Sequence, residues 1–256
     1  MARRVQGRLV PPRRMLGVLG GMGPAATVDF YSKLVKATPA SRDQEHIPVL
    51  IAADPRIDDR SEAIKTGRGD VLSGMLIGLR HLDRAGVEAI AIPCNTAHHW
   101  LPELQVHTRT PFISLIEAAA REARRHNPSA TRALVAGTIG TIKSHLYDSE
   151  LRRLGFEVAP VIRRDQEQVE RVISCVKAGK MQAAAAAFLK AAPTWCERAD
   201  VVLLACTELP LAMPLEFSRE GRFVDSTAAL ARACVEWATS DTSGPIADRL
   251  RGRVST

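Results

Sequence analysis

The sequence is poor in aromatic residues and has no cysteine spacing of the kind that binds metal ions. Aromatic side chains make up 4% of the 256 residues, which argues against the stacking platforms that bind single-stranded nucleic acid. The five cysteines form no C-x-x-C pair and no zinc-type spacing, and an odd, scattered set suits the reducing cytoplasm. No apolar run approaches the roughly 20 residues that a membrane-spanning helix needs. We therefore expect a cytoplasmic protein with no metal, no nucleic-acid partner and no membrane partner.

The sequence also lacks a dinucleotide-binding fingerprint, although a glycine-rich turn follows its first predicted strand. Gly17, Gly20, Gly21 and Gly23 have the spacing G-x-x-G-G-x-G, and Pro24 removes a backbone donor where a pyrophosphate would bind. We predict that these glycines let the backbone approach a small anionic substrate. No cofactor is expected, because no segment carries a compelling cofactor motif.

Basic residues are concentrated at the start of the chain. Removing the five arginines of the first fourteen residues lowers the formal net charge from +7 to +2, so the remainder is nearly balanced. We expect residues 1–14 to form a disordered basic tail. Residues 241–256 have no apolar periodicity, and we expect them to fray.

Apolar runs alternate with helix-favouring segments along the chain. Such alternation predicts an α/β fold with parallel sheets flanked by helices, in which ligands bind beyond the carboxyl ends of the strands. The predicted strands are Met15–Leu19, Pro48–Ala53, Ala89–Ile92, Phe112–Leu115, Arg132–Ala136, Phe156–Ile162 and Val201–Ala205. The predicted helices are Ala25–Lys36, Asp70–Ala85, Ile116–Arg125, Lys143–Leu154, Gln166–Ala178, Met181–Glu197 and Thr227–Ala238.

Two segments with the same pattern indicate an internal repeat. Leu16–Gly23 and Ala133–Gly140 each run from an apolar strand into a glycine-containing turn. A cysteine follows a later strand in both halves, 73 residues after the turn in the first and 69 in the second. We predict two similar lobes related by a pseudo-twofold axis, residues 15–110 plus 225–240 and residues 111–224, with the active site in the cleft between them. A single larger sheet is the alternative.

Two of the cysteines occupy matched positions in this repeat. Cys94 and Cys206 each follow an apolar run typical of a buried parallel strand and precede residues that can start a helix. Free backbone N–H groups and the positive helix end favour a thiolate there. The pair therefore predicts two acid/base groups that face one substrate from opposite sides. The alternative, a buried apolar side chain, is our interpretation of Cys175, Cys196 and Cys234, which lie in predicted helices.

Seven short segments, spread from Leu16 to about Ala238, match the motifs of one known family. They are Gly17–Pro24, Arg42–His46, Asp59-Arg60, Pro93–His98, Gly137-Thr138 with Thr141, Lys177–Gly179 and Cys206–Glu208. In these segments the chain resembles the aspartate/glutamate racemase family, and the run from Thr38 to His46 with Asp59-Arg60 resembles its aspartate branch. One departure is Ala205, where many relatives carry glycine before the second cysteine.

The resemblance implies a homodimeric isomerase that interconverts L- and D-aspartate, or glutamate, without pyridoxal phosphate or another cofactor. Cys94 and Cys206 would move the α-proton, one acting as base while the other acts as acid. Arg60 and Lys177 would bind the side-chain carboxylate of this small acidic amino-acid substrate. The other residues that the resemblance places at the substrate are Met22, Asn95, Thr96, Ala97, Thr138, Thr207 and Glu208.

Several alternatives stay open at the level of sequence. Glu208 either binds the substrate ammonium, orients Cys206 or complements a helix dipole, and His98 either tunes the Cys94 thiol or has a structural role. The same residues also suit a related isomerase or decarboxylase of a small dicarboxylic acid or hydantoin. A non-catalytic small-anion binding protein on this scaffold is the third function to test.

Overall fold

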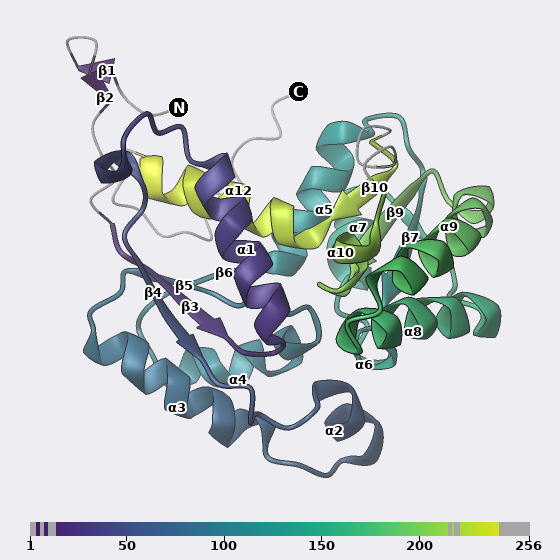
Figure 1. Cartoon of the computed structure of the whole chain (residues 1–256), viewed down its shortest axis with the longest axis horizontal. Helices are drawn as coiled ribbons and strands as arrows, with labels where there is room; N and C mark the ends of the chain where they lie inside the picture. Colours follow the sequence, from purple (N-terminus) through teal and green to yellow (C-terminus); the bar gives the residue numbers. More distant parts are fainter. Residues whose placement is uncertain (1–3, 6–7, 10–13, 215–216, 218–220, 241–256) are drawn as a thin grey trace.

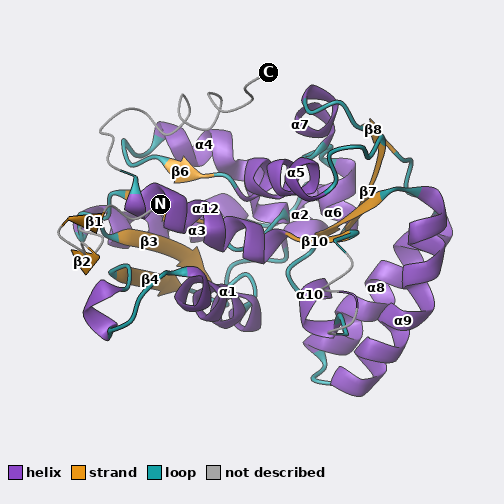
Figure 2. Ribbon diagram, turned by 90° about the horizontal axis from the view of Figure 1, so that it is seen from above, coloured by secondary structure: helices purple, strands orange, loops and turns teal. Residues whose placement is uncertain are grey.

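The protein consists of two lobes, each built on a four-stranded parallel sheet with helices against it (Figures 1 and 2). The computed structural model describes residues 4–5, 8–9, 14–214, 217 and 221–240. Both sheets have the same strand order when their strands are numbered within each lobe, namely second, first, third and fourth. The predicted α/β fold with two similar lobes is confirmed.

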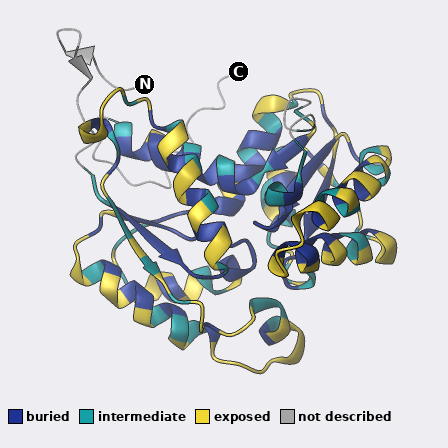
Figure 3. Ribbon diagram, in the orientation of Figure 1, coloured by how far each residue is buried: buried dark blue, intermediate teal, exposed yellow. Residues whose placement is uncertain are grey.

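The first sheet has the order β4-β3-β5-β6. Its central strands β3 and β5 are buried along their whole length, which explains their uninterrupted apolar runs (Figure 3). Its strands are β3 (Leu16–Gly20), β4 (Val49–Ala53), β5 (Ala89–Ala91) and β6 (Phe112–Ile113). The helices of this half are α1 (Pro24–Ala37), the short 3-10 helix η1 (Asp43–Glu45), α2 (Arg60–Thr66), α3 (Val71–Arg84), the 3-10 helix η2 (Thr96–Trp100) and α4 (Leu101–Val106).

The second sheet has the order β10-β9-β7-β8, and β9 is likewise fully buried. Its strands are β7 (Arg132–Gly137), β8 (Glu157–Val158), β9 (Val201–Ala205) and β10 (Phe223–Asp225). The helices of this half are α5 (Leu115–His126), α6 (Ile139–Lys143), α7 (Asp148–Arg153), α8 (Arg163–Lys177), α9 (Met181–Arg198) and α10 (Leu209–Ala212). A last helix, α12 (Ser226–Thr239), follows β10.

Some elements differ from the sequence predictions. The predicted helix 143–154 begins only at Asp148 as α7, because α6 ends at Lys143 and the chain turns through His145, whose φ is 49°. The first sheet extends to β6, beyond the boundary that we placed at residue 110, and β6 stops at Ile113 because Ser114 caps α5. The strand β10 was not predicted, and the predicted strand 156–162 is only the two residues of β8.

The two ends of the chain are described only in part. Arg4–Val5 (β1) and Arg8–Leu9 (β2) form a short antiparallel pair, which corrects the expectation of a wholly disordered tail. Arg14 donates a hydrogen bond from Nη1 to the carbonyl oxygen of Trp237 at 3.0 Å. The rest of the predicted basic tail and the predicted frayed segment 241–256 lie outside the described residues. Within the described part of the chain, every helix is too short or too polar to cross a lipid bilayer.

The glycine turn after β3 brings two strand ends together. At Gly21, where φ is 89°, an added Cβ atom would lie 2.4 Å from the backbone nitrogen of Asp54, which follows β4. Only glycine fits such a contact. The close approach is therefore to the protein's own backbone, and the next residue, Met22, is the one that reaches the space between the lobes.

His98 fixes the loop that carries Cys94. The backbone N–H of Leu115 donates to His98 Nε2 at 3.1 Å, so the proton of the neutral ring is on Nδ1, which donates to the carbonyl oxygen of Cys94 at 2.9 Å. Burial lowers the pKa of His98 to about 4. His98 thus ties the end of β5 to the start of α5, and its ring bonds the Cys94 carbonyl and not the thiol.

The low pKa of His98 predicts a loss of stability in mild acid. Between about pH 6.5 and pH 4 the unfolded chain binds a proton at this position and the folded protein does not, so stability falls as the pH falls. The difference is about 2.4 kcal/mol between pH 7 and pH 4.5. The free energy of unfolding, measured in urea, should fall over this interval by about that much less in His98→Gln than in the wild type. His99→Gln, which changes an exposed neighbour, should behave like the wild type; equal pH dependence in all three proteins would contradict the prediction.

Candidate active site

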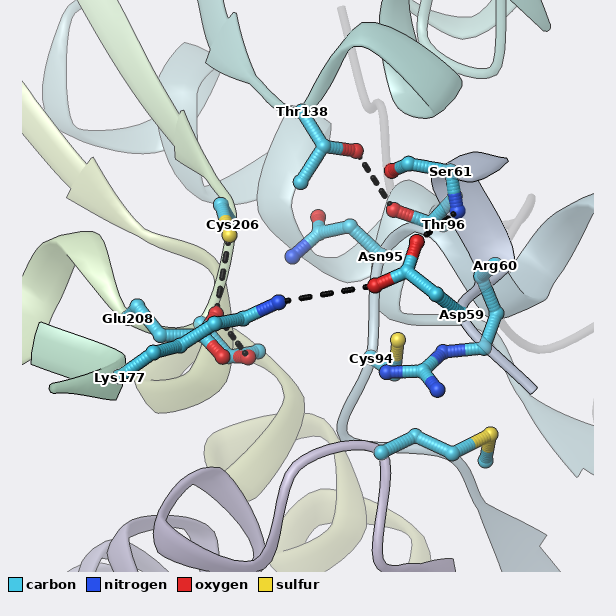
Figure 4. Close-up of a pocket in the computed structure, with 12 residues that line it drawn as sticks. Asp59, Arg60, Ser61, Cys94, Asn95, Thr96, Thr138, Lys177, Cys206 and Glu208 are labelled. Carbon is cyan, nitrogen blue, oxygen red and sulfur yellow. Dashed lines mark hydrogen bonds and ion pairs between the residues drawn. The ribbon is translucent and has the colours of Figure 1, made fainter. Parts of the chain in front are cut away.

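One cavity lies between the carboxyl ends of the two sheets (Figure 4). It brings together ten of the eleven residues predicted at the site. The exception is Ala97, whose side chain is fully buried in the core of the first lobe. The cavity is lined by Met22, Asp59, Arg60, Ser61, Cys94, Asn95, Thr96, Thr138, Lys177, Cys206, Thr207 and Glu208.

The two cysteines enter this cavity from different lobes. Cys94 follows β5 and Cys206 follows β9, and Figure 4 shows them on either side of the space. Their exposed fractions are 6% and 5%, and burial raises the pKa of both thiols. Backbone N–H groups of Ala97 and Glu208 oppose this effect, as expected for thiols beside helix starts, but burial outweighs them. Ala97 therefore contributes its backbone and not its side chain.

Three of the four charged residues at the cavity come from α8 and from α2 with its N-cap, and the fourth, Glu208, precedes α10. Asp59 caps α2 by accepting hydrogen bonds from the backbone nitrogens of Ser61 and Glu62, at 2.9 and 3.0 Å. Although burial raises the pKa of Asp59, the Glu62 N–H and the charge of Lys177 outweigh it and lower the pKa. Lys177 Nζ lies 3.7 Å from Asp59 Oδ2, so this ion pair joins the two lobes.

Arg60 is positioned by backbone carbonyl groups beside Cys94. Its Nη1 donates to the carbonyl oxygens of Ile57 and Asp58, at 3.1 and 2.9 Å. Its Nε is buried and has no hydrogen-bond partner within the described residues. A buried donor without a partner is costly unless a ligand or water satisfies it, so Arg60 presents a donor for an anion.

Three threonine hydroxyls connect the lobes on another side of the cavity. Thr96 Oγ1 lies 2.8 Å from Thr138 Oγ1 and 2.9 Å from Thr141 Oγ1. Gly140 permits this approach, because an added Cβ atom would lie 2.8 Å from Thr96 Cγ2 and 2.9 Å from Ser61 Cα. The start of α6 therefore packs directly against the first lobe.

A buried chain of hydrogen bonds holds Asn95. Tyr147 donates its hydroxyl to Asn95 Oδ1 at 2.5 Å, and Asn95 Nδ2 donates to Ser226 Oγ at 3.1 Å. Ser226 donates in turn to the carbonyl oxygen of Leu204 at 2.8 Å. One Nδ2 hydrogen of Asn95 is thus committed to the protein and one is left for a ligand. No local sequence pattern indicates Tyr147 or Ser226 as site residues, since neither belongs to a motif and both reach the site through tertiary packing.

Removal of the Tyr147 hydroxyl tests this network. Tyr147→Phe leaves the buried Asn95 oxygen without its donor, which should lower the free energy of unfolding by about 1–3 kcal/mol in urea titrations. The only other tyrosine, Tyr31, is 44% exposed on α1, so Tyr31→Phe should change stability by less than about 0.5 kcal/mol. Equal stability of Tyr147→Phe and the wild type would show that the network does not hold Asn95.

Comparisons with known proteins agree with this geometry. The family described as Asp/Glu/Hydantoin racemase matches residues 19–234. The broad specificity amino-acid racemase RacX of Bacillus subtilis (strain 168) is 30% identical over 230 residues, which cover 86% of this chain and 96% of that protein. The structure of Picrophilus torridus aspartate racemase superposes with a TM-score of 0.77 at 29% identity, covering 93% of this chain and 98% of that one.

A more distant structure supports the fold alone. Glutamate racemase from Francisella tularensis subsp. tularensis SCHU S4, in complex with D-glutamate, is 17% identical with a TM-score of 0.64 and covers 91% of this chain and 86% of its own. The family match over residues 19–234 spans most of the chain and therefore establishes its family. The chain belongs to the Asp/Glu/hydantoin racemase family.

Proposed function

We propose that this protein interconverts the L- and D-forms of an acidic amino acid, aspartate in preference to glutamate, without a bound cofactor. The observation that carries the proposal is that two buried cysteines from different lobes line one cavity. The names of the relatives, an aspartate racemase and a broad-specificity amino-acid racemase, support this class of reaction. Cys94, Cys175, Cys206 and Cys234 form no disulfide with any described residue, which suits a reducing compartment, and we place the activity in the cytoplasm.

The proposed reaction moves one proton off the substrate Cα and another onto its opposite face. A thiolate on one cysteine takes the α-proton and becomes a thiol. The thiol on the other cysteine gives its proton to the opposite face of the carbanion and becomes a thiolate. The pair carries one negative charge before and after the step, and the roles of Cys94 and Cys206 are exchanged for the other enantiomer.

The residues around the cysteines provide the remaining contacts of the proposal. The N–H and hydroxyl donors of Asn95, Thr96 and Thr207 would hold the α-carboxylate and stabilise the charge that develops on it. Arg60, whose buried Nε has no hydrogen-bond partner in the described part of the chain, and Lys177 would bind the side-chain carboxylate. The substrate carboxylate would then replace Asp59 as the partner of Lys177.

Deuterium incorporation tests the function and the choice of cysteines together. In D2O the wild type should convert L-aspartate to the D-form and place deuterium at Cα, as seen by proton NMR and chiral chromatography. Cys94→Ser and Cys206→Ser should each lower racemisation by about 10²–10⁴-fold, because serine is scarcely ionised near neutral pH. Any exchange that survives in the two variants should label opposite enantiomers.

Cys196→Ser is the matched control, because Cys196 lies on α9 and does not line the cavity. It should racemise aspartate like the wild type. Absence of both label and D-aspartate at high protein concentration, for glutamate as well as aspartate, would leave only a binding protein. Full activity of either Cys94→Ser or Cys206→Ser would show that the pair is wrong.

Neutralising Lys177 tests recognition of the side-chain carboxylate. Lys177→Met should lower kcat/KM for aspartate by about 10–100-fold, the loss expected for a hydrogen bond to a charged group. The kcat/KM for asparagine, which lacks the carboxylate charge, should change much less. Lys180→Met, at an exposed neighbouring position, should leave both values unchanged. A parallel loss for both substrates in Lys177→Met would mean that Lys177 does not read the side chain.

A further inference from the structure

The two cysteines have different charged neighbours, although they occupy equivalent positions in the two lobes. Cys206 donates a hydrogen bond from Sγ to Glu208 Oε2 at 2.9 Å (Figure 4). The Thr207 hydroxyl donates to the same oxygen at 3.3 Å. Glu208 is 8% exposed, so water screens its charge little. A carboxylate that accepts from a thiol stabilises the thiol and disfavours the thiolate.

Cys94 has a cation where Cys206 has an anion. The guanidinium group of Arg60 lies next to the Cys94 sulfur in Figure 4, and its charge favours a thiolate there. The backbone N–H of Ala97 favours the thiolate as well. No carboxylate accepts a hydrogen bond from Cys94 among the contacts of the described residues.

The other titratable groups around the pair do not reverse this difference. Asp59 and Lys177 are paired with each other at the cavity. His98 bonds the carbonyl of Cys94, and with its pKa near 4 it is neutral at the working pH. Tyr147 lies behind Cys206, and burial raises its pKa far above the neutral range, so it too is uncharged.

We propose that Glu208 is a positioning residue that keeps the proton on Cys206, while Arg60 stabilises the thiolate on Cys94, so that in the free protein a singly ionised pair holds its one negative charge on Cys94. The consequence of this proton placement for catalysis rests on the proposed function, whereas the placement itself is independent of that function. Electrostatics supports it, because burial raises the pKa of both thiols and Glu208 adds to the rise at both. At Cys94 the charge of Arg60 opposes the rise by more than Glu208 adds, whereas no cation opposes it among the leading causes at Cys206.

The position of the charge in the singly ionised pair sets which enantiomer meets a thiolate base. A substrate that presents its Cα–H to Cys94 gives that proton to the Cys94 thiolate, and the Cys206 proton moves to the opposite face of Cα. The product state has a thiol at Cys94 and a thiolate at Cys206 beside Glu208. Before the same enantiomer reacts again, Cys206 must take a proton from water and Cys94 must release one to water.

Alkylation by iodoacetamide measures the two thiols separately and without any substrate. The thiolate sulfur displaces iodide from the reagent, and the rate at each cysteine follows its thiolate fraction as the pH rises. Peptide mass spectrometry after short exposures from pH 6 to pH 10 gives a midpoint for each site. Because each midpoint is taken within one site, unequal access of the reagent does not affect it.

In the wild type, the midpoint of Cys94 should lie at lower pH than that of Cys206, whose rate should still be rising at pH 10. Glu208→Gln should lower the midpoint of Cys206 by at least about one pH unit and that of Cys94 by less. Arg60→Met should raise the midpoint of Cys94. Glu103→Gln, which neutralises an exposed glutamate on α4, should leave both midpoints unchanged.

A wild-type midpoint of Cys206 at or below that of Cys94 would overturn the proposal, and this comparison needs no variant to fold. An unchanged Cys206 midpoint in a folded Glu208→Gln protein would also overturn it. The outcome is independent of racemisation. Ordered midpoints without racemisation would refute the proposed function alone, and racemisation with reversed midpoints would refute the role of Glu208 alone.

Discussion

The packing of α12 against both lobes determines how the two halves of the site meet. α12 leaves the second sheet after β10, and it packs against α1 of the first lobe and against α5 (Figure 1). The buried residues around it come from both sheets and form one continuous apolar core. Ser226, at the start of α12, bonds the side chain of Asn95 and the carbonyl of Leu204. One serine thus links the segment beside Cys94 to the strand that ends just before Cys206.

In the proposed reaction two buried thiols serve as acid and base, and their burial limits how many of them can be ionised at once. Burial disfavours a thiolate at either position, so two simultaneous thiolates would be costly. The proposed reaction never requires two, because one thiol is formed as the other is lost. A single cation beside one cysteine and a single carboxylate beside the other therefore suffice to define the starting state, and the backbone donors of Ala97 and Glu208 lower the cost of the exchange.

The sequence was informative where function depends on short motifs and uninformative where it depends on tertiary contacts. The buried strands and the repeat follow from apolar runs, and Cys94 and Cys206 follow from their positions after strands. The other eight predicted cavity residues follow from the resemblance to a known family. Ser61, Tyr147 and Ser226 reach the site through packing between segments far apart in the chain, which no local pattern encodes. Ala97 shares the motif of its neighbours, yet η2 turns its side chain into the core.

The internal repeat supplies two thiols in equivalent places, but nothing requires their surroundings to be equal. L- and D-aspartate have the same free energy in water, so kcat/KM must be the same in both directions for any racemase of this amino acid. If the free protein favours one protonation state, the rarer state must therefore react faster with its own enantiomer, so that kcat/KM stays equal in both directions. Arg60 and Glu208 belong to different lobes and only one of each is needed, so the asymmetry costs the scaffold nothing. The equality of kcat/KM applies to the complete reaction and not to either cysteine alone. Unequal neighbours around equivalent cysteines are therefore compatible with it.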